Sequence, residues 1–141
     1  MYVRYVILEE HDETRKEMGV FQAFSALEDS LVEQGLKFQD YELEWLTETV
    51  TWFDQNLRTA RTISTNYPKA TYWFKASAKE CIDRVQMLVV LLEQYGFHTK
   101  RIEADSFDYI LYEDEYQALA LNKDDVPYKE ARHYEKYRRR R

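Results

Sequence analysis

Apolar and polar positions follow two different periods along this chain. Residues 3–8, VRYVIL, are dense in β-branched and aromatic residues and predict a strand, and the charged stretch 9–17, EEHDETRKE, predicts a solvated turn. From Gly19 to about Gln34 the apolar residues recur every three or four positions, which predicts a helix. Gly35 can then supply the left-handed residue that ends it.

A second helix is predicted from Asp40, as its N-cap, to about Asn56. Glu42, Glu44 and Glu48 lie off its apolar stripe, and the two that stand near its start suit the positive end of the helix dipole. The stripe consists of Leu43, Leu46, Val50, Phe53 and Leu57.

Residues 58–75 show no sustained period, and Pro68 biases the residue before it away from the helical region. A connection of this length is unusual in a compact domain, so residues 70–75, ATYWFK, are predicted to form a short strand. A third helix follows, because Ser77 and Glu80 match a capping box and Gly96 can close the helix. Its apolar stripe is Ala78, Cys81, Ile82, Val85, Leu88, Val89 and Leu92.

Three more strands are predicted at 97–103, 107–112 and 116–122. The order of one strand, three helices and three strands predicts an α+β fold with a small, mainly antiparallel sheet packed by helices. Residues 1–125 are expected to form one globular domain, and residues 126–141 a basic tail that is either disordered or docked on a surface.

Composition supports a folded protein. The chain has 141 residues, of which 16% are aromatic, and a chain of this length can bury a sizeable core without metals or disulfides. Its one cysteine, Cys81, cannot form an intramolecular disulfide, which favours a reducing, cytoplasmic setting. The start of the chain lacks the pattern of a signal peptide, and the longest apolar run, 87–92, is too short to span a bilayer. We therefore expect no membrane contact.

The net charge of −6 conceals an alternation in sign. Residues 1–54 carry a net charge of −9 and residues 80–125 carry −7. Between them, residues 55–79 contain five bases and no acid, and residues 126–141 carry a net charge of +5. The acid-free segment 55–79 is the most unusual feature of the sequence.

Glu113, Asp114 and Glu115 join two apolar runs without a glycine. Since two-residue hairpins favour glycine, a longer turn from Glu113 to Tyr116 is predicted. We weigh three interpretations: a solvated hairpin tip, a metal or catalytic site, and a partner for a basic segment. The tip is favoured, because no Asp-x-Asp-x-Asp-Gly pattern of a metal loop occurs.

Five short stretches of this chain occur together in one order: VRYVIL, GVFQA at 19–23, WFDQNL at 52–57, WFK at 73–75 and YILYEDEYQALA at 109–120. In this respect the chain resembles a group of short uncharacterised bacterial proteins over residues 1–121. The resemblance implies one compact domain. It implies no activity, ligand or catalytic residue.

The acid-free segment is a candidate binding site for an anionic partner. Its arginines and lysines can bind phosphates, and its aromatic rings can stack. The alternative is structural, with Trp73 and Phe74 in the core and the cations neutralising the acidic second helix. The candidate residues are Arg58, Arg61, Lys69, Tyr72, Trp73 and Lys75.

The basic tail is the second candidate. Its cations could hold nucleic acid phosphates or a protein partner, or could dock on the acidic surface of the protein itself, where Glu113, Asp114 and Glu115 are available. Because the body of the chain is acidic, any contact with nucleic acid must be local. The tail residues that we single out are Lys136, Arg138, Arg139, Arg140 and Arg141.

Signals for catalysis are weak. The three histidines show no metal-site spacing, Cys81 lies on an apolar stripe, and with three glycines neither nucleotide-binding glycine motif can be written. We therefore expect no cofactor and lean against an enzyme. The sequence favours a non-catalytic protein that binds a protein partner or self-associates. The alternatives are an RNA- or DNA-binding protein, and a metal-dependent hydrolase built from carboxylates.

Overall fold

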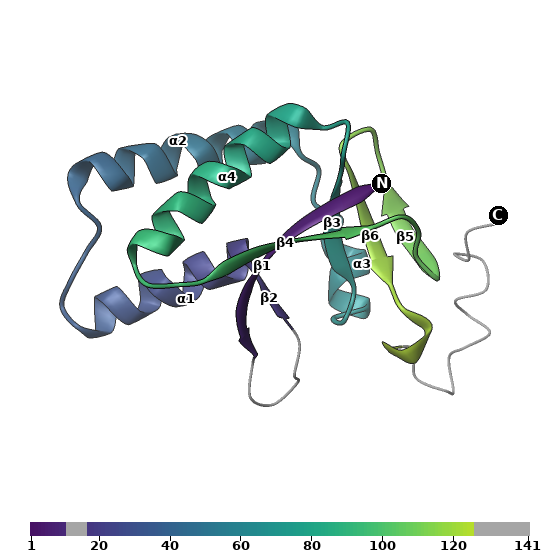
Figure 1. Ribbon diagram of the computed structural model, residues 1–141, viewed down its shortest axis with the longest axis horizontal. Coiled ribbons are helices and arrows are strands. Elements are labelled where there is room, and N and C mark those ends of the chain that lie inside the picture. Colours follow the sequence, from purple (N-terminus) through teal and green to yellow (C-terminus); the bar gives the residue numbers. More distant parts are fainter. Residues whose placement is uncertain (11–16, 126–141) are drawn as a thin grey trace. The chain divides into compact units, whose positions relative to one another are not determined.

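The computed structural model describes residues 1–10 and 17–125, with the backbone alone at 8–10, 17, 61 and 64. The predicted tail, 126–141, and most of the predicted turn lie outside the described residues. The α+β class is confirmed. The elements in chain order are β1 (Tyr2–Glu10), β2 (Glu17–Gly19), α1 (Val20–Glu33), α2 (Asp40–Asn56), α3 (Arg61–Asn66), β3 (Thr71–Lys75), α4 (Lys79–Gln94), β4 (Thr99–Ala104), β5 (Tyr109–Glu113), β6 (Gln117–Leu121) and a 3-10 turn at Lys123–Asp125 (Figure 1).

The strands pair in the order β2-β1-β3-β6-β5, and β4 also pairs with β1. The pairs β1–β2, β1–β3, β3–β6 and β5–β6 are antiparallel, as predicted. β2 was not predicted, because its three residues, EMG, stand at the end of a charged stretch and lack the residue types that mark a strand.

The described chain divides into two compact units. Unit 1 combines residues 1–4, 57–79 and 103–125, and unit 2 combines residues 5–56 and 80–102. β1 and β4 each contribute residues to both units. A single domain over residues 1–125 stays a prediction.

Unit 1 is built around β6, whose five residues are all buried. Leu119 and Leu121 of β6 form an apolar cluster with Tyr109 and Leu111 of β5. α3 covers this cluster with Ile63, and Figure 1 shows α3 beside β3 and β6. α3 was not predicted, because its six residues, RTISTN, are too few to show a helical period.

Unit 2 contains the three long helices, α1, α2 and α4. Two glycines end helices as predicted: Gly35 after α1 has φ +71° and Gly96 after α4 has φ +90°, and both values lie in the left-handed region. Phe38, in the link between α1 and α2, lies with its ring 6.4 Å from that of Phe24 and 5.5 Å from that of Tyr95. These contacts join α1, the link before α2 and the end of α4.

The buried face of α2 differs from the prediction. The helix buries the line Glu42, Leu46, Thr49 and Phe53, so that the predicted core residues Leu43 and Val50 remain 49% and 41% exposed. Leu57, the last residue of the predicted stripe, falls after the end of α2. Leu46 and Phe53 belong to both lines, so the buried face is rotated by about 50°, or half a residue step, from the apolar stripe.

Glu42 explains this rotation. Its Oε1 accepts a hydrogen bond of 3.0 Å from the backbone N–H of Gln39 and one of 2.6 Å from the hydroxyl of Tyr95. A buried carboxylate is costly unless hydrogen bonds satisfy it, and here both donors lie within unit 2. Burial, followed by the hydrogen bond to Glu42, raises the pKa of Tyr95 to about 12. Sequence reasoning had placed Glu42 among the solvent-facing acids of the helix.

The rotation of α2 can be tested with two matched leucines. We expect Leu46→Ala to lower the free energy of unfolding by about 2–5 kcal/mol, because it leaves a cavity in the core. Leu43→Ala on the same helix should change it by less than about 0.5–1 kcal/mol, since Leu43 is half exposed. Urea denaturation followed by far-ultraviolet circular dichroism measures both values. Equal losses for the two leucines would contradict the observed face.

Candidate functional site

The turn between β5 and β6 is held by the side chain of Asp114. The Oδ1 atom of Asp114 accepts hydrogen bonds from the backbone N–H groups of Tyr116, at 2.8 Å, and Gln117, at 3.0 Å. The backbone N–H of Asp114 in turn donates to the carbonyl of Gln117 at 3.0 Å. An aspartate that bonds to the backbone two residues ahead stabilises a turn without glycine. The carboxylate of Asp114 therefore has a structural role.

The second oxygen of Asp114 is also occupied. Its Oδ2 atom accepts hydrogen bonds from the hydroxyl of Tyr112 at 2.8 Å and from Nε2 of Gln117 at 3.5 Å. Burial by itself would raise the pKa of Asp114, but the hydrogen bonds from Tyr116, Tyr112 and Gln117 outweigh it and lower the pKa below 3.8. The hydrogen bond that the hydroxyl of Tyr112 donates to Asp114, followed by partial burial, raises the pKa of Tyr112.

Gln117 connects the acidic turn to the acid-free segment. This side chain is 4% exposed, and its Nε2 donates a hydrogen bond of 2.6 Å to the backbone carbonyl of Arg58. The backbone at the start of the acid-free segment is thereby fixed on a buried amide. Sequence reasoning missed this role of Gln117, although a polar residue that opens a buried strand is a signal that it needs a partner.

Glu113 makes a second connection, on the opposite face of the sheet. Its Oε1 atom lies 3.0 Å from Nζ of Lys75 and accepts a hydrogen bond of 3.2 Å from the hydroxyl of Tyr2. The side chains of Lys75 and Glu113 are 27% and 28% exposed, so we expect this ion pair to contribute no more than about 1 kcal/mol. The structure thus shows a basic residue of segment 55–79 paired with the acidic turn, which was the third interpretation of that turn.

The aromatic residues of the acid-free segment are used within unit 1. The indole N–H of Trp73 donates to Oγ1 of Thr71 at 3.0 Å, and its ring lies 5.1 Å from that of Phe107. The hydroxyl of Tyr72 accepts a hydrogen bond of 3.0 Å from the backbone N–H of Ala60. Both residues were candidates for stacking on a ligand, and both instead contact the fold.

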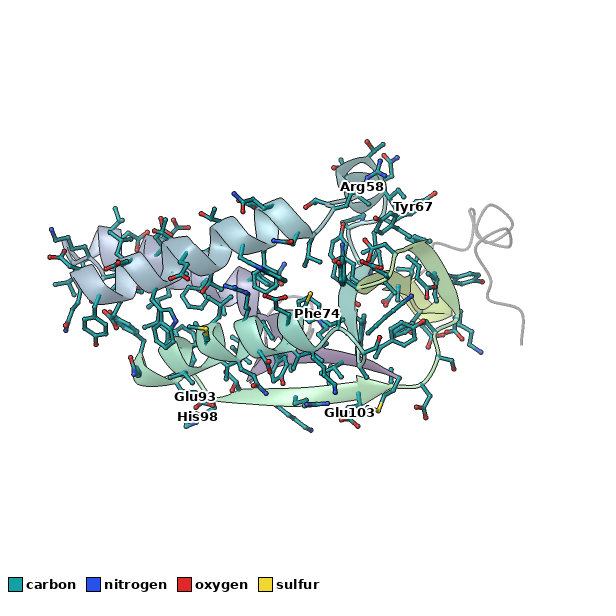
Figure 2. All side chains as sticks on the ribbon, turned by 90° about the horizontal axis from the view of Figure 1, so that it is seen from above. Arg58, Tyr67, Phe74, Glu93, His98 and Glu103 are labelled. Carbon is teal, nitrogen blue, oxygen red and sulfur yellow. The ribbon has the colours of Figure 1, made fainter. Side chains whose placement is uncertain are left out.

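The cations of the acid-free segment differ in their surroundings. Lys75 is paired with Glu113. The side chains of Arg58 and Lys69 are exposed. Figure 2 shows Arg58 next to α3, on the same side of unit 1 as Tyr67. Arg61 is the first residue of α3, and its side chain is not among those described. The tail candidates Lys136 and Arg138 to Arg141 lie outside the described residues.

The three acids of the turn do not converge on one point. Glu113 bonds to Lys75 and Tyr2, while Asp114 bonds to Tyr112 and to the backbone of the turn, and Glu115 is exposed. Among the described residues, no group of three or more histidines, cysteines, aspartates or glutamates is arranged to hold a metal ion. Cys81 is 1% exposed, as its place on an apolar stripe predicted.

Comparisons with known proteins add no relative. The chain matches no protein family, no curated protein and no solved structure. Within residues 1–10 and 17–125, no helix combines the length and the apolar character that crossing a membrane requires.

Removal of the Asp114 side chain should destabilise unit 1. We expect Asp114→Ala to lower the free energy of unfolding by about 1–3 kcal/mol, because two backbone N–H groups and the hydroxyl of Tyr112 lose their acceptor. Glu115→Ala, in the same turn but exposed, is the matched control and should cost less than about 0.5 kcal/mol. Urea denaturation measures both, and similar values for the two variants would refute the structural role of Asp114.

The depressed pKa of Asp114 predicts a dependence of stability on pH. The folded chain holds this carboxyl below its ordinary pKa of 3.8, so its contribution is present above that pH. The contribution is lost as the pH falls through the folded pKa, because the proton then breaks the hydrogen bonds. We expect the urea midpoint of the parent chain to fall more steeply than that of Asp114→Asn between about pH 5 and 2. Parallel curves would contradict the shift.

Proposed function

We propose that this chain is a non-catalytic binding protein that contacts an acidic segment of a protein partner through the outward side of residues 57–70. One observation carries the proposal. Ala60, Ile63, Tyr67 and Ala70 of this stretch pack against the apolar cluster of β5 and β6, and its exposed positions include basic and hydroxyl groups and no carboxylate. We call this surface, formed by Arg58, Thr59, Thr62, Thr65 and Lys69, the basic surface.

α3 and its flanks produce this arrangement through their pattern. Ile63 and Tyr67 are one helical turn apart and pack on the cluster of β5 and β6. Thr62, just before Ile63, and Thr65, between Ile63 and Tyr67, are exposed, and hydroxyl groups can donate hydrogen bonds to carboxylates. The inward packing of Ile63 and Tyr67 therefore decides which residues a partner can reach.

Arg58 is the residue on which we expect binding to depend most. Its backbone carbonyl is held by the buried Gln117, which fixes the point from which its exposed side chain extends. A guanidinium can bind a carboxylate through two parallel hydrogen bonds, and a fixed backbone lowers the entropy that binding must overcome. These features support an anionic partner at this position.

The charge of the whole chain favours a protein over a nucleic acid. A chain with a net charge of −6 repels the extended charge of a nucleic acid, whereas a short acidic segment can contact one basic surface locally. Binding of RNA or DNA through Arg138 to Arg141 stays a prediction, because these residues lie outside the described part of the chain. The interactions of Glu113 and Asp114 within unit 1 give no support to a metal-dependent hydrolase, and we do not propose one.

Fluorescence anisotropy tests the proposal. A labelled polyglutamate peptide and single- and double-stranded oligonucleotides are titrated with the full chain at low and near-physiological salt. We expect the acidic peptide to bind, and the double variant Arg58→Glu, Lys69→Glu to weaken that binding at least about tenfold. Lys100→Glu, an exposed cation on β4, makes the same charge change per residue elsewhere and should change it less than about twofold.

The other outcomes are equally informative. Binding of oligonucleotides that is lost when Arg138 to Arg141 are replaced by serine would assign the function to nucleic acid. Failure of the full chain to bind any anionic probe, or equal losses for the Lys100 control and the double variant, would refute the basic surface.

A further inference from the structure

Exposed apolar side chains gather along the junction of α1 and α2 in unit 2. Single exposed apolar residues are common on protein surfaces, whereas a contiguous group of them marks a binding surface. We call this group the α1–α2 seam. It consists of Phe21 (44% exposed) and Val32 (71%) on α1, Leu36 (54%) in the link, and Leu43 (49%) and Val50 (41%) on α2.

The contribution of α1 is placed by a ring contact. Phe21 lies beside the buried line of α1, and its ring meets that of Phe53 on α2 edge-on, with ring centroids 5.3 Å apart. The edge of α1 that carries Phe21 is therefore the edge next to α2. Val32 follows Phe21 by eleven residues, about three turns, and so lies on the same edge.

The buried line of α2 also determines on which side of the helix Leu43 and Val50 lie. One edge of α2 carries Trp52, over which the guanidinium of Arg84 from α4 lies at 4.6 Å from the ring centroid. That edge therefore faces α4. Leu43 and Val50, seven residues apart, lie on the other side of the buried line of α2, which is the side away from α4. Both helices thus expose apolar side chains along their shared junction.

The charge of α1, α2 and the link between them is mostly negative. Between Val20 and Asn56 the chain has eight carboxylates and a single base, Lys37. The seven acids other than the buried Glu42 all stand on exposed helical positions: Glu28, Asp29, Glu33, Asp40, Glu44, Glu48 and Asp54. An apolar surface within such a field repels nucleic acids and anionic membranes, and it attracts a partner that combines apolar residues with positive charge.

We propose that the α1–α2 seam docks a basic amphipathic helix of a partner protein. The distance along α1 from Phe21 to Val32 corresponds to about 16 Å, which matches about eleven residues of a partner helix. Apolar residues of that helix, spaced by three and four positions, contact the seam, and its lysines or arginines face the surrounding carboxylates. This partner differs in charge from the acidic partner of the basic surface, so the two inferences stand or fall independently.

The probe is a fluorescein-labelled synthetic helix of about 14 residues, with leucines at helical spacing and lysines at the other positions. Its two controls are a scrambled peptide of the same composition without the period, and a peptide with glutamate in place of each lysine. Binding to the full chain is followed by fluorescence anisotropy. We expect the basic amphipathic peptide to bind most tightly, with an affinity that falls as salt rises.

Two variants locate the binding. Val32→Ser, Leu43→Ser changes two exposed residues of the seam and should weaken binding at least about tenfold. Val90→Ser, at a position on α4 that is 45% exposed and outside the seam, should change it less than about twofold. Circular dichroism melting checks that each variant stays folded. We expect the fold to be retained, because the substituted side chains are exposed.

Four results would overturn the proposal. The full chain fails to bind the basic peptide, the scrambled peptide binds as tightly, or the seam variant binds as the parent does. In the fourth, the peptide binds only after Arg138 to Arg141 are replaced by serine, which assigns the seam to the tail of this protein. Light scattering adds a fifth: a dimer of the parent chain that the seam variant abolishes would assign the seam to a second copy.

Discussion

The complete burial of β6 is the constraint on which unit 1 depends. A strand that is buried at all five residues must pair its backbone groups on both sides, and β3 and β5 provide that pairing. It must also enter from solvent through a turn whose polar groups are satisfied. Asp114 and Gln117 meet that requirement at the start of the strand, and they tie the turn to the carbonyl of Arg58. The position of the basic surface therefore depends on the turn at the start of β6, because this turn holds the carbonyl of Arg58.

Unit 2 follows the same physical rule with different residues. A carboxylate, Glu42, lies where an apolar residue was expected, and it is tolerated because Gln39 and Tyr95 donate to it. Among the described residues, no buried side-chain nitrogen or oxygen lacks a hydrogen-bond partner. The burial of Glu42 turns α2 about its axis and leaves Leu43 and Val50 outside the core. One buried acid thereby creates the exposed apolar edge of the seam.

Sequence reasoning succeeded where a long period met a clear end signal. The helix that Gly96 closes and the strand at 117–121 are examples, and the α+β class followed from their order. It failed where a tertiary partner decided the outcome: the face of α2 depends on Tyr95, and α3 is stabilised by the cluster it covers rather than by its own sequence. The link from Lys75 to Glu113 required the register of β3, β6 and β5, which a single sequence does not reveal.

The tryptophans are divided between the two units, so that fluorescence can follow each unit separately. Trp73, against Phe107, is the one tryptophan in the ranges that form unit 1, and Trp45 and Trp52 belong to unit 2. The ring of Trp52 carries the guanidinium of Arg84, whereas that of Trp73 carries no such cation in the described structure. The emission of a chain that retains Trp73 alone therefore reports on the sheet of unit 1, and the emission of the other two on the helices of unit 2. The protein contains its own optical labels for asking whether its two halves melt together or one after the other.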